Sequence, residues 1–304
     1  MKLRDLGLLF LLAAMWGASF LFIRLAAPAL GPTVLVTARV FIAGFALLIY
    51  ARMIRHDLAV RKHWRKFLLL GALNASIPFT LIATAELELT ASFGAILNAT
   101  TPLFGALIAA VWLKDALTAR KIAGLVLGIS GVAVAVGWSP IPLNLTVLLS
   151  IGASLLGAFF YGLGGVYSKV AFKGTPPLSI SIGQALGAGI GLLPLALANP
   201  PQSVPPTLVI FSVLMLALPC TALAYLIYFR LIASAGPTSA MSVTFIVPVF
   251  GMIWGRIFLD EPIGAGLVTG FAVILAGLLL VTGVRLPLLT APITTSTQEA
   301  KAAH

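Results

Sequence analysis

Few ionisable residues lie within or beside the long apolar stretches of this sequence, so each of them is a candidate for chemistry. Arg39 lies inside one stretch, and Glu86 and Glu88 close another. A charge in an apolar environment is costly unless it is paired, so we predict that Arg39 pairs with one of the two glutamates. Such a pair fits a gate that breaks in one conformational state, or equally a permanent tie between two segments.

Two prolines interrupt the middle of two other stretches, at Pro102 and Pro248. A proline removes one backbone donor and frees the carbonyl one turn earlier. Polar side chains accompany both prolines, with Asn98 and Thr101 beside the first and Thr244 beside the second. These groups either line a cavity as two weakly polar half-sites, or they mark packing kinks whose threonine hydroxyls bond their own helix.

Aromatic residues near the middle of apolar stretches form a second set of candidates. Trp16 and Tyr161 lie in two such stretches, with Ser19 close to Trp16, and Tyr225 and Tyr228 share a third. A tyrosine hydroxyl at that depth needs a polar partner, which a wet cavity supplies, and an ammonium group can rest on the ring faces. We predict that these side chains line a cavity. The alternative is ordinary core packing.

The residue patterns that the sequence lacks limit the kinds of site that it can form. No carboxylate falls near the middle of an apolar stretch, the three histidines have no metal-ligand spacing, and Cys220 is the single cysteine. We therefore expect no catalytic residue, no metal site and no cofactor. A cavity lined by hydroxyls, amides and aromatic rings suits a molecule of zero net charge, such as a zwitterion.

Composition sets the environment of these residues. Of the 304 residues, 60% are apolar and 9% are charged, whereas about 25% are charged in a soluble domain. This excludes an ordinary soluble enzyme and a disordered chain, and it indicates that lipid is the solvent. The net charge of +11 comes from basic residues between the apolar stretches. Such residues face anionic lipid heads, so the charge does not indicate a nucleic-acid partner.

Ten stretches are long enough to span a bilayer as helices, because about 20 apolar residues cross its core. The predicted spans are 6–27, 33–51, 67–86, 91–112, 119–137, 146–168, 178–198, 207–229, 237–258 and 264–284. The polar end, 287–304, is predicted to be a disordered cytoplasmic tail.

The basic residues predict the orientation of the chain. With the amino terminus inside, every Lys and Arg except Arg24, Arg39 and Arg256 falls on the cytoplasmic side, which is 16 of 19. This bias places both termini in the cytoplasm. Arg24, Asp260 and Glu261 then lie near the outer rim, where we expect them to be solvated. The predicted pair between Arg39 and a glutamate also lies toward the outer side, so it would be either an outer gate or a static tie at that side.

The chain also contains an internal repeat. Residues 91–137 align without gaps on residues 237–283 at an offset of 146, and the front of each half aligns at an offset of 145. The matched pairs include Pro102 with Pro248, Asp115 with Glu261, Trp16 with Tyr161, and Arg39 with Gln184. Each half, 6–137 and 146–284, holds five predicted spans, so the second half is inverted relative to the first. Inverted repeats of this kind recur in secondary transporters.

Several motifs resemble those of a known family. The run Trp16-Gly17-Ala18-Ser19-Phe20 resembles the first-helix signature of EamA-type proteins in the drug/metabolite transporter superfamily. Thr101-Pro102-Leu103-Phe104 and Val247-Pro248-Val249-Phe250 resemble its repeated proline element, and Leu259-Asp260-Glu261-Pro262 resembles its acidic element after the ninth helix. Within this family the chain is most similar to the bacterial amino-acid exporters of the YddG type.

The resemblance implies an all-α integral membrane protein with ten helices in two inverted five-helix repeats around a central cavity. It implies a secondary transporter of the bacterial inner membrane that exports small neutral or zwitterionic metabolites, such as amino acids, by alternating access. The expected partners are that substrate and membrane lipid, with the monomer as the functional unit. Two alternatives remain: an intramembrane enzyme acting on lipid or isoprenoid substrates, and a multidrug or other metabolite carrier of the same superfamily.

Overall fold

The fold is built from membrane-spanning helices, as the apolar stretches predict. The computed structural model describes residues 2–56, 58, 60–138 and 144–283, and this part of the chain contains no β-strand. Ten of its helical segments are long and apolar enough to cross a membrane. The tail predicted at 287–304 lies outside the described residues.

Six of the ten spans are single helices, and the other four are broken. The single helices are α1 (Leu3–Leu30), α2 (Pro32–Met53), α7 (Ala119–Gly137), α8 (Leu145–Ala171), α9 (Pro177–Ala198) and α14 (Ala265–Thr282). The third span consists of α3 (Val60–Gly71), η1 (Ala72–Ser76) and α4 (Ile77–Ala85), and the fourth of α5 (Ala91–Asn98) and α6 (Thr101–Trp112). The eighth span consists of α10 (Thr207–Ala217), η2 (Leu218–Leu223) and α11 (Ala224–Ala235), and the ninth of α12 (Pro237–Met241) and α13 (Val243–Leu259). The broken spans are the third, fourth, eighth and ninth, so the breaks themselves follow the repeat.

The span boundaries agree closely with the predicted ones, with two larger differences. The third span begins at His63 rather than at 67, and the eighth ends at Ala235 rather than at 229. Both extensions contain basic residues, Arg65 and Lys66 in one and Arg230 in the other. The helices therefore continue beyond the apolar core into the interface, where long basic side chains reach water.

The third and eighth spans each contain a π-helical turn at matching positions. The turns η1 and η2 begin at Ala72 and Leu218, and the interval between these residues equals the offset of the repeat. A π-helical turn is rare and often lies at a functional site, because it redirects side chains and loosens the backbone hydrogen bonds. The equivalent position of the two turns makes the third and eighth spans candidates for carrying a site.

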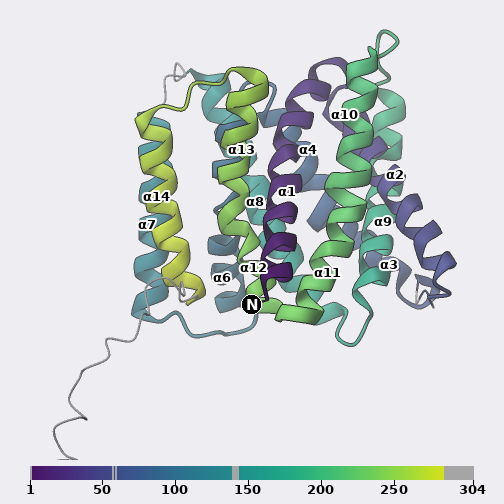
Figure 1. Ribbon diagram of the computed structural model, residues 1–304, viewed down its shortest axis with the longest axis horizontal. Coiled ribbons are helices and arrows are strands. Elements are labelled where there is room, and N and C mark those ends of the chain that lie inside the picture. The colour runs from purple at the N-terminus through teal and green to yellow at the C-terminus, as the bar shows by residue number, and fades with distance from the viewer. Residues whose placement is uncertain (1, 57, 59, 139–143, 284–304) are drawn as a thin grey trace, which may run out of the picture.

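The contacts between helices reproduce the inverted repeat. Helix α1 packs against α13, and the equivalent helix α8 packs against α6. Helix α2 packs against its own counterpart α9, and α7 packs against its counterpart α14. Figure 1 shows α7 and α14 side by side at one end of the molecule and α2, α3 and α9 gathered at the other end. Arg39 lies on α2, inside one of these end groups, and α1, α8 and α11, which carry the aromatic candidates, lie between the two groups.

Glycines make the α7–α14 contact close. Gly124 on α7 faces Gly277 on α14, and a Cβ added to Gly277 would lie 2.5 Å from the carbonyl oxygen of Gly124. Gly131 faces the backbone around Gly270 and Ile274 in the same way. The glycine spacing in these helices therefore marks an internal seam between the two halves, as small residues do in other membrane helix pairs.

Gly277→Ala is expected to destabilise the protein by about 1–3 kcal/mol, because the added methyl group forces the two backbones apart. Gly137→Ala is the matched control, since no heavy atom lies within 4 Å of a Cβ at that position near the end of α7. Unfolding by SDS in mixed micelles measures both variants. Equal stability of the two variants would contradict the close seam.

Candidate functional site

Arg39 lies at the centre of the most polar cluster between the two halves. It projects from α2, is 5% exposed, and donates from Nε to the hydroxyl of Thr221 at 3.0 Å. Thr221 belongs to the π-helical turn η2, and its hydroxyl donates in turn to the carbonyl of Leu216 at 2.7 Å. The guanidinium carbon of Arg39 lies 3.9 Å from the centre of the Phe79 ring. The side chain is therefore held by a hydroxyl on one side and an aromatic face on another.

The predicted pair between Arg39 and a glutamate does not form in this conformation. In the part of the chain that the structure describes, the guanidinium bonds Thr221 and not Glu86 or Glu88. The reason is axial distance, because Phe79, which covers the guanidinium, precedes Glu86 by seven residues, or about 10 Å of helix rise. Arg39 therefore faces the interior of the bundle in this conformation, and its role in an outer gate stays a prediction.

Gln184, the repeat partner of Arg39, forms a second polar link between the halves. The Asn74 amide donates to Gln184 Oε1 at 2.9 Å, and Gln184 Nε2 donates to the Tyr225 hydroxyl at 2.9 Å. Asn74 lies in the π-helical turn η1 of the first half, and Gln184 and Tyr225 lie on α9 and α11 of the second. Arg39 and Gln184 thus each bond a π-helical turn of the opposite half, and the two turns are equivalent in the repeat.

The predicted aromatic residues lie in pairs around this cluster. Trp16 packs on Tyr228 with ring centres 5.4 Å apart, and Tyr161 meets Phe79 edge to face at 5.8 Å. Trp16 and Tyr161 are repeat partners, and each packs on a helix of the other half. Trp16, Tyr161 and Tyr228 are half-buried rather than fully buried. The structure therefore places all four predicted aromatic side chains, Tyr225 included, along the interface between the halves.

The threonine hydroxyls beside the prolines form hydrogen bonds with the backbone of their own span. The hydroxyl of Thr101 donates to the carbonyl of Asn98 at 2.8 Å, and that of Thr244 donates to the carbonyl of Met241 at 2.9 Å. These bonds match the packing-kink alternative. The break before Pro102 falls between α5 and α6, but Pro248 lies inside the continuous helix α13, and the break in its span lies earlier, at Ser242. The two proline sites are therefore not equivalent.

Ser19 is buried on α1 next to the Cys220 thiol, and its hydroxyl has no oxygen or nitrogen partner among the described residues. The hydroxyl of Thr80 on α4, one residue beyond Phe79, has no such partner either. A buried hydroxyl without a partner costs free energy, and a ligand or water that bonds it recovers that cost. Ser19 therefore keeps the role of a candidate lining residue.

At the outer end, Glu261 holds the two halves together. Its carboxylate accepts from the backbone N–H of Ala91 at 2.7 Å, and from the N–H of Ser92 at 2.9 Å and its hydroxyl at 2.5 Å. These donors form the amino end of α5, where a negative charge is stabilised by the helix dipole. Glu261 is only 6% exposed, so the expectation of a solvated residue is wrong. The N–H groups at the start of α5 donate the hydrogen bonds that water would otherwise donate to this carboxylate.

Arg24 binds the same loop from the other side. Its guanidinium donates to the carbonyls of Glu86 and Leu87, at the end of α4. A cation at the carboxyl end of a helix complements the unpaired carbonyls there. The segment between α4 and α5 is thus fixed by Arg24 of α1 and by Glu261 of the second half. Arg24 is half-buried rather than solvated, because these carbonyls replace its water.

Glu86 and Glu88, the two glutamates predicted to pair with Arg39, differ in their exposure to solvent. Glu88 is exposed, but Glu86 is 0% exposed, and neither of its carboxylate oxygens has a hydrogen-bond partner among the described residues. Burial, with a smaller contribution from Glu261, raises the pKa of the Glu86 carboxyl well above its usual range, and Arg24 and Arg39 oppose this only in part. A buried carboxyl without partners is most stable in its protonated, neutral form.

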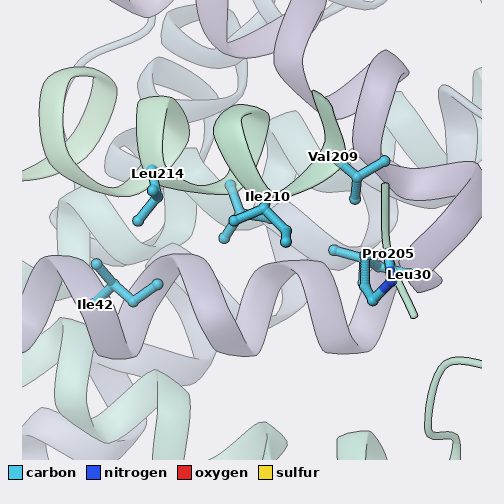
Figure 2. A pocket seen from close by; sticks show the side chains of 7 residues that line it. Leu30, Ile42, Pro205, Val209, Ile210 and Leu214 are labelled. Atoms are coloured by element: carbon cyan, nitrogen blue, oxygen red, sulfur yellow. The ribbon is translucent and has the colours of Figure 1, made fainter. Parts of the chain in front are cut away.

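The two cavities described at the surface do not contain this cluster. One, of about 180 Å³, lies between α1, α2 and α10 and has only apolar lining residues, among them Leu30, Ile42 and Ile210 (Figure 2). The other, of about 590 Å³, lies between α1, α2, α9 and α11, and its lining includes Tyr50, His56 and Arg230. The first offers no polar group that could orient a zwitterion.

Sequence reasoning missed several residues of the cluster. Asn74, Phe79 and Thr221 carry no pattern that separates them from ordinary span residues. Gln184 was marked by its alignment with Arg39, which is the one signal that could have placed it in the site. Their partners lie 41 to 182 residues away in the chain, so only the packing of the helices brings them together.

The fold and the repeat agree with comparisons to known proteins. The model of the EamA-like transporter family matches the chain twice, at residues 5–137 and 148–283, so each match covers one five-helix half. The chain belongs to the EamA-like transporter family. A solved crystal structure with 16% sequence identity superposes with a TM-score of 0.63, covering 92% of this chain and 96% of that chain, and supports the same fold.

Relatives of the family span nearly the whole chain. The uncharacterized transporter YvbV of Bacillus subtilis is 27% identical over 287 residues, covering 92% of each chain. Protein PecM of Dickeya dadantii is 25% identical over 289 residues, covering 94% of each. The uncharacterized inner membrane transporter YedA of Escherichia coli is 25% identical over 266 residues, covering 84% of each. The chain is therefore a multi-pass transporter of the bacterial inner membrane, and not an enzyme.

Proposed function

We propose that this EamA-family protein is a secondary transporter that exports small neutral or zwitterionic metabolites, and that amino acids with apolar or aromatic side chains are among them. This is the substrate class of the YddG-type exporters that the sequence resembles. The observation that carries the proposal is the link from Asn74 through Gln184 to Tyr225, which joins the two halves with uncharged polar groups at the π-helical turns.

The surroundings of this link suit an amino acid. Trp16, Tyr161 and Tyr228 offer ring faces and edges for an apolar or aromatic side chain and for an ammonium group. In the described part of the chain no carboxylate is bonded to these residues. An organic cation would therefore find no counter-ion at this depth, whereas a zwitterion brings its own.

Alternating access is supported by a difference between the two ends of the molecule. At the outer end, Glu261 bonds the amino end of α5. Its repeat partner Asp115 is exposed at the inner end. The outer end is therefore held closed by a contact that the described part of the inner end lacks. This difference is expected for one state of an alternating-access transporter, in which the inner end would form the equivalent contact when the outer end opens. The monomer, with lipid around it, is the proposed functional unit.

Reconstituted protein is expected to take up labelled L-leucine and L-phenylalanine into liposomes with saturation, and to leave a cationic dye such as ethidium outside. Uptake is measured with and without an imposed pH gradient, against empty liposomes and against liposomes with a control transporter. Uptake of the dye alone, or no amino-acid uptake beside an active control, would overturn the proposed substrate class. A gradient-dependent rate would indicate proton coupling, and an unchanged rate facilitated diffusion.

A further inference from the structure

Arg39 is a buried cation without an anionic partner in the described structure. A guanidinium has five N–H donors, and the structure assigns a partner only to Nε, which bonds Thr221. The remaining donors belong to the two Nη groups. Neither Nη atom is among the fully buried side-chain atoms without a partner, so both remain accessible to water or a ligand. A charged side chain within a membrane protein usually marks a site where an ion or substrate binds. Here the residue lies 5% exposed, next to the link that joins the halves.

The contacts of Arg39 hold it in one orientation and do not neutralise it. The Thr221 hydroxyl is oriented by its own bond to Leu216, so its oxygen is directed to accept from Nε. The ring of Phe79 covers one face of the guanidinium and is itself positioned by Tyr161. The side chain is thus prearranged before any ligand arrives, which lowers the entropic cost of binding.

Two tyrosines complete the surroundings. The charge of Arg39 reaches the side chains of Tyr161 and Tyr225. The Tyr225 oxygen accepts from Gln184, which leaves its own O–H as a donor. A planar pair of Nη donors matches a carboxylate, which accepts two parallel bonds from a guanidinium and keeps further lone pairs for a bond from another donor such as the Tyr225 hydroxyl.

We infer that Arg39 binds the carboxylate of the transported molecule, with the Tyr225 hydroxyl as a second donor. This deepens the proposed function, on which it rests, because it makes a carboxylate a requirement and leaves the amino group and side chain to the aromatic faces. Molecules with an amine and no carboxylate are excluded, since they bring a second positive charge to a site that already holds one.

Binding to the purified protein in detergent tests this without requiring transport. The probes are L-phenylalanine, L-phenylalaninamide, 3-phenylpropanoate and phenethylamine, which differ in the two charged groups and keep the ring. The two carboxylates are expected to bind about 10- to 100-fold more tightly than the amide and the amine, as charged hydrogen bonds usually provide. Arg39→Gln is expected to remove this preference, and Arg230→Gln, at an exposed arginine of the inner end, to keep it.

A second variant protects the test against misfolding of Arg39→Gln. Thr221→Ala keeps the charge and removes the hydroxyl that orients it, so carboxylate affinity is expected to fall by about tenfold while the order of the probes is kept. Carboxylate preference that survives in Arg39→Gln overturns the inference, as does a parent protein that binds the carboxylates no better than the amide. If liposomes then transport phenethylamine, the protein is still a transporter and only the carboxylate site is wrong.

Discussion

Glu261→Ala is expected to open the outer end of the transporter and to raise the free energy of the closed conformation by about 3 kcal/mol, because it leaves buried backbone donors without an acceptor. The carboxylate accepts from Ala91 N–H and from both donors of Ser92. In an open conformation water can bond these groups, so the cost falls on the closed one. The ratio of closed to open molecules should then fall by about 100-fold.

A cysteine below the outer tie reports this change. Ser19 is buried on α1, so Ser19→Cys in a Cys220→Ala background should react slowly with a membrane-impermeant maleimide added from outside. The rate should rise strongly when Glu261→Ala is added. Glu88→Ala is the matched control, since Glu88 is a glutamate of the same outer rim and is exposed, and it should leave the rate unchanged.

Glu261→Gln separates opening from misfolding. The amide keeps one acceptor oxygen for the amino end of α5 and loses the charge that the helix dipole stabilises. An intermediate labelling rate is therefore expected, with an unchanged elution volume in size-exclusion chromatography. Equal labelling rates in the parent protein, Glu261→Ala and Glu88→Ala would show that the tie does not hold the outer end closed.

The helices of this protein could be predicted from the sequence because lipid imposes a simple rule. A span must be apolar over about 20 residues, and its backbone must be bonded within the helix. The inverted repeat could also be predicted from the sequence, because prolines and glycines recur at a nearly constant offset between the two halves. The π-helical turns were not, since no residue type in Ala72–Ser76 or Leu218–Leu223 requires them.

The candidate site was predictable in its residue types but not in its contacts. Trp16 and Tyr228 were both expected at a cavity, and the structure brings them together. Arg39 was expected to pair with Glu86 or Glu88, and Glu261 was expected to be solvated, but both make other contacts in the structure. Their true partners, Thr221 and the amino end of α5, are 182 and about 170 residues away. Depth in the membrane can be counted along a helix, but the direction of a side chain is set by the neighbours that packing supplies.

Glu86→Gln is expected to remove a pH dependence that the parent protein shows. The raised pKa of Glu86 means that the folded protein keeps this proton at pH values where the unfolded chain, with a glutamate pKa of about 4.3, has lost it. Between these two pKa values the folded state binds more protons. Its stability therefore falls as pH rises, by up to about 1.4 kcal/mol per pH unit for one proton.

The charged groups around Glu86 influence its pKa in the folded protein, and so they set the upper limit of the pH range in which stability falls. Glu261 disfavours the Glu86 carboxylate, and Arg24 and Arg39 favour it, but burial is the largest cause of the raised pKa. In the Gln variant the side chain is neutral at every pH, so stability should become less dependent on pH and should exceed that of the parent protein at alkaline pH. The slope of this difference with pH measures how many more protons the folded protein binds than the unfolded chain at that pH.

Free energies of unfolding in mixed micelles, measured from pH 5 to pH 9, compare the parent protein with Glu86→Gln and with Glu88→Gln. The control changes an exposed glutamate two residues away, so it should follow the parent curve. A Glu86→Gln curve parallel to that of the parent would mean that the Glu86 carboxyl is already ionised in the folded protein, and that Arg24 or Arg39 compensates it. That result would contradict the raised pKa of Glu86, whereas a flattened curve identifies Glu86 as a group that is protonated in the folded protein and ionised in the unfolded chain.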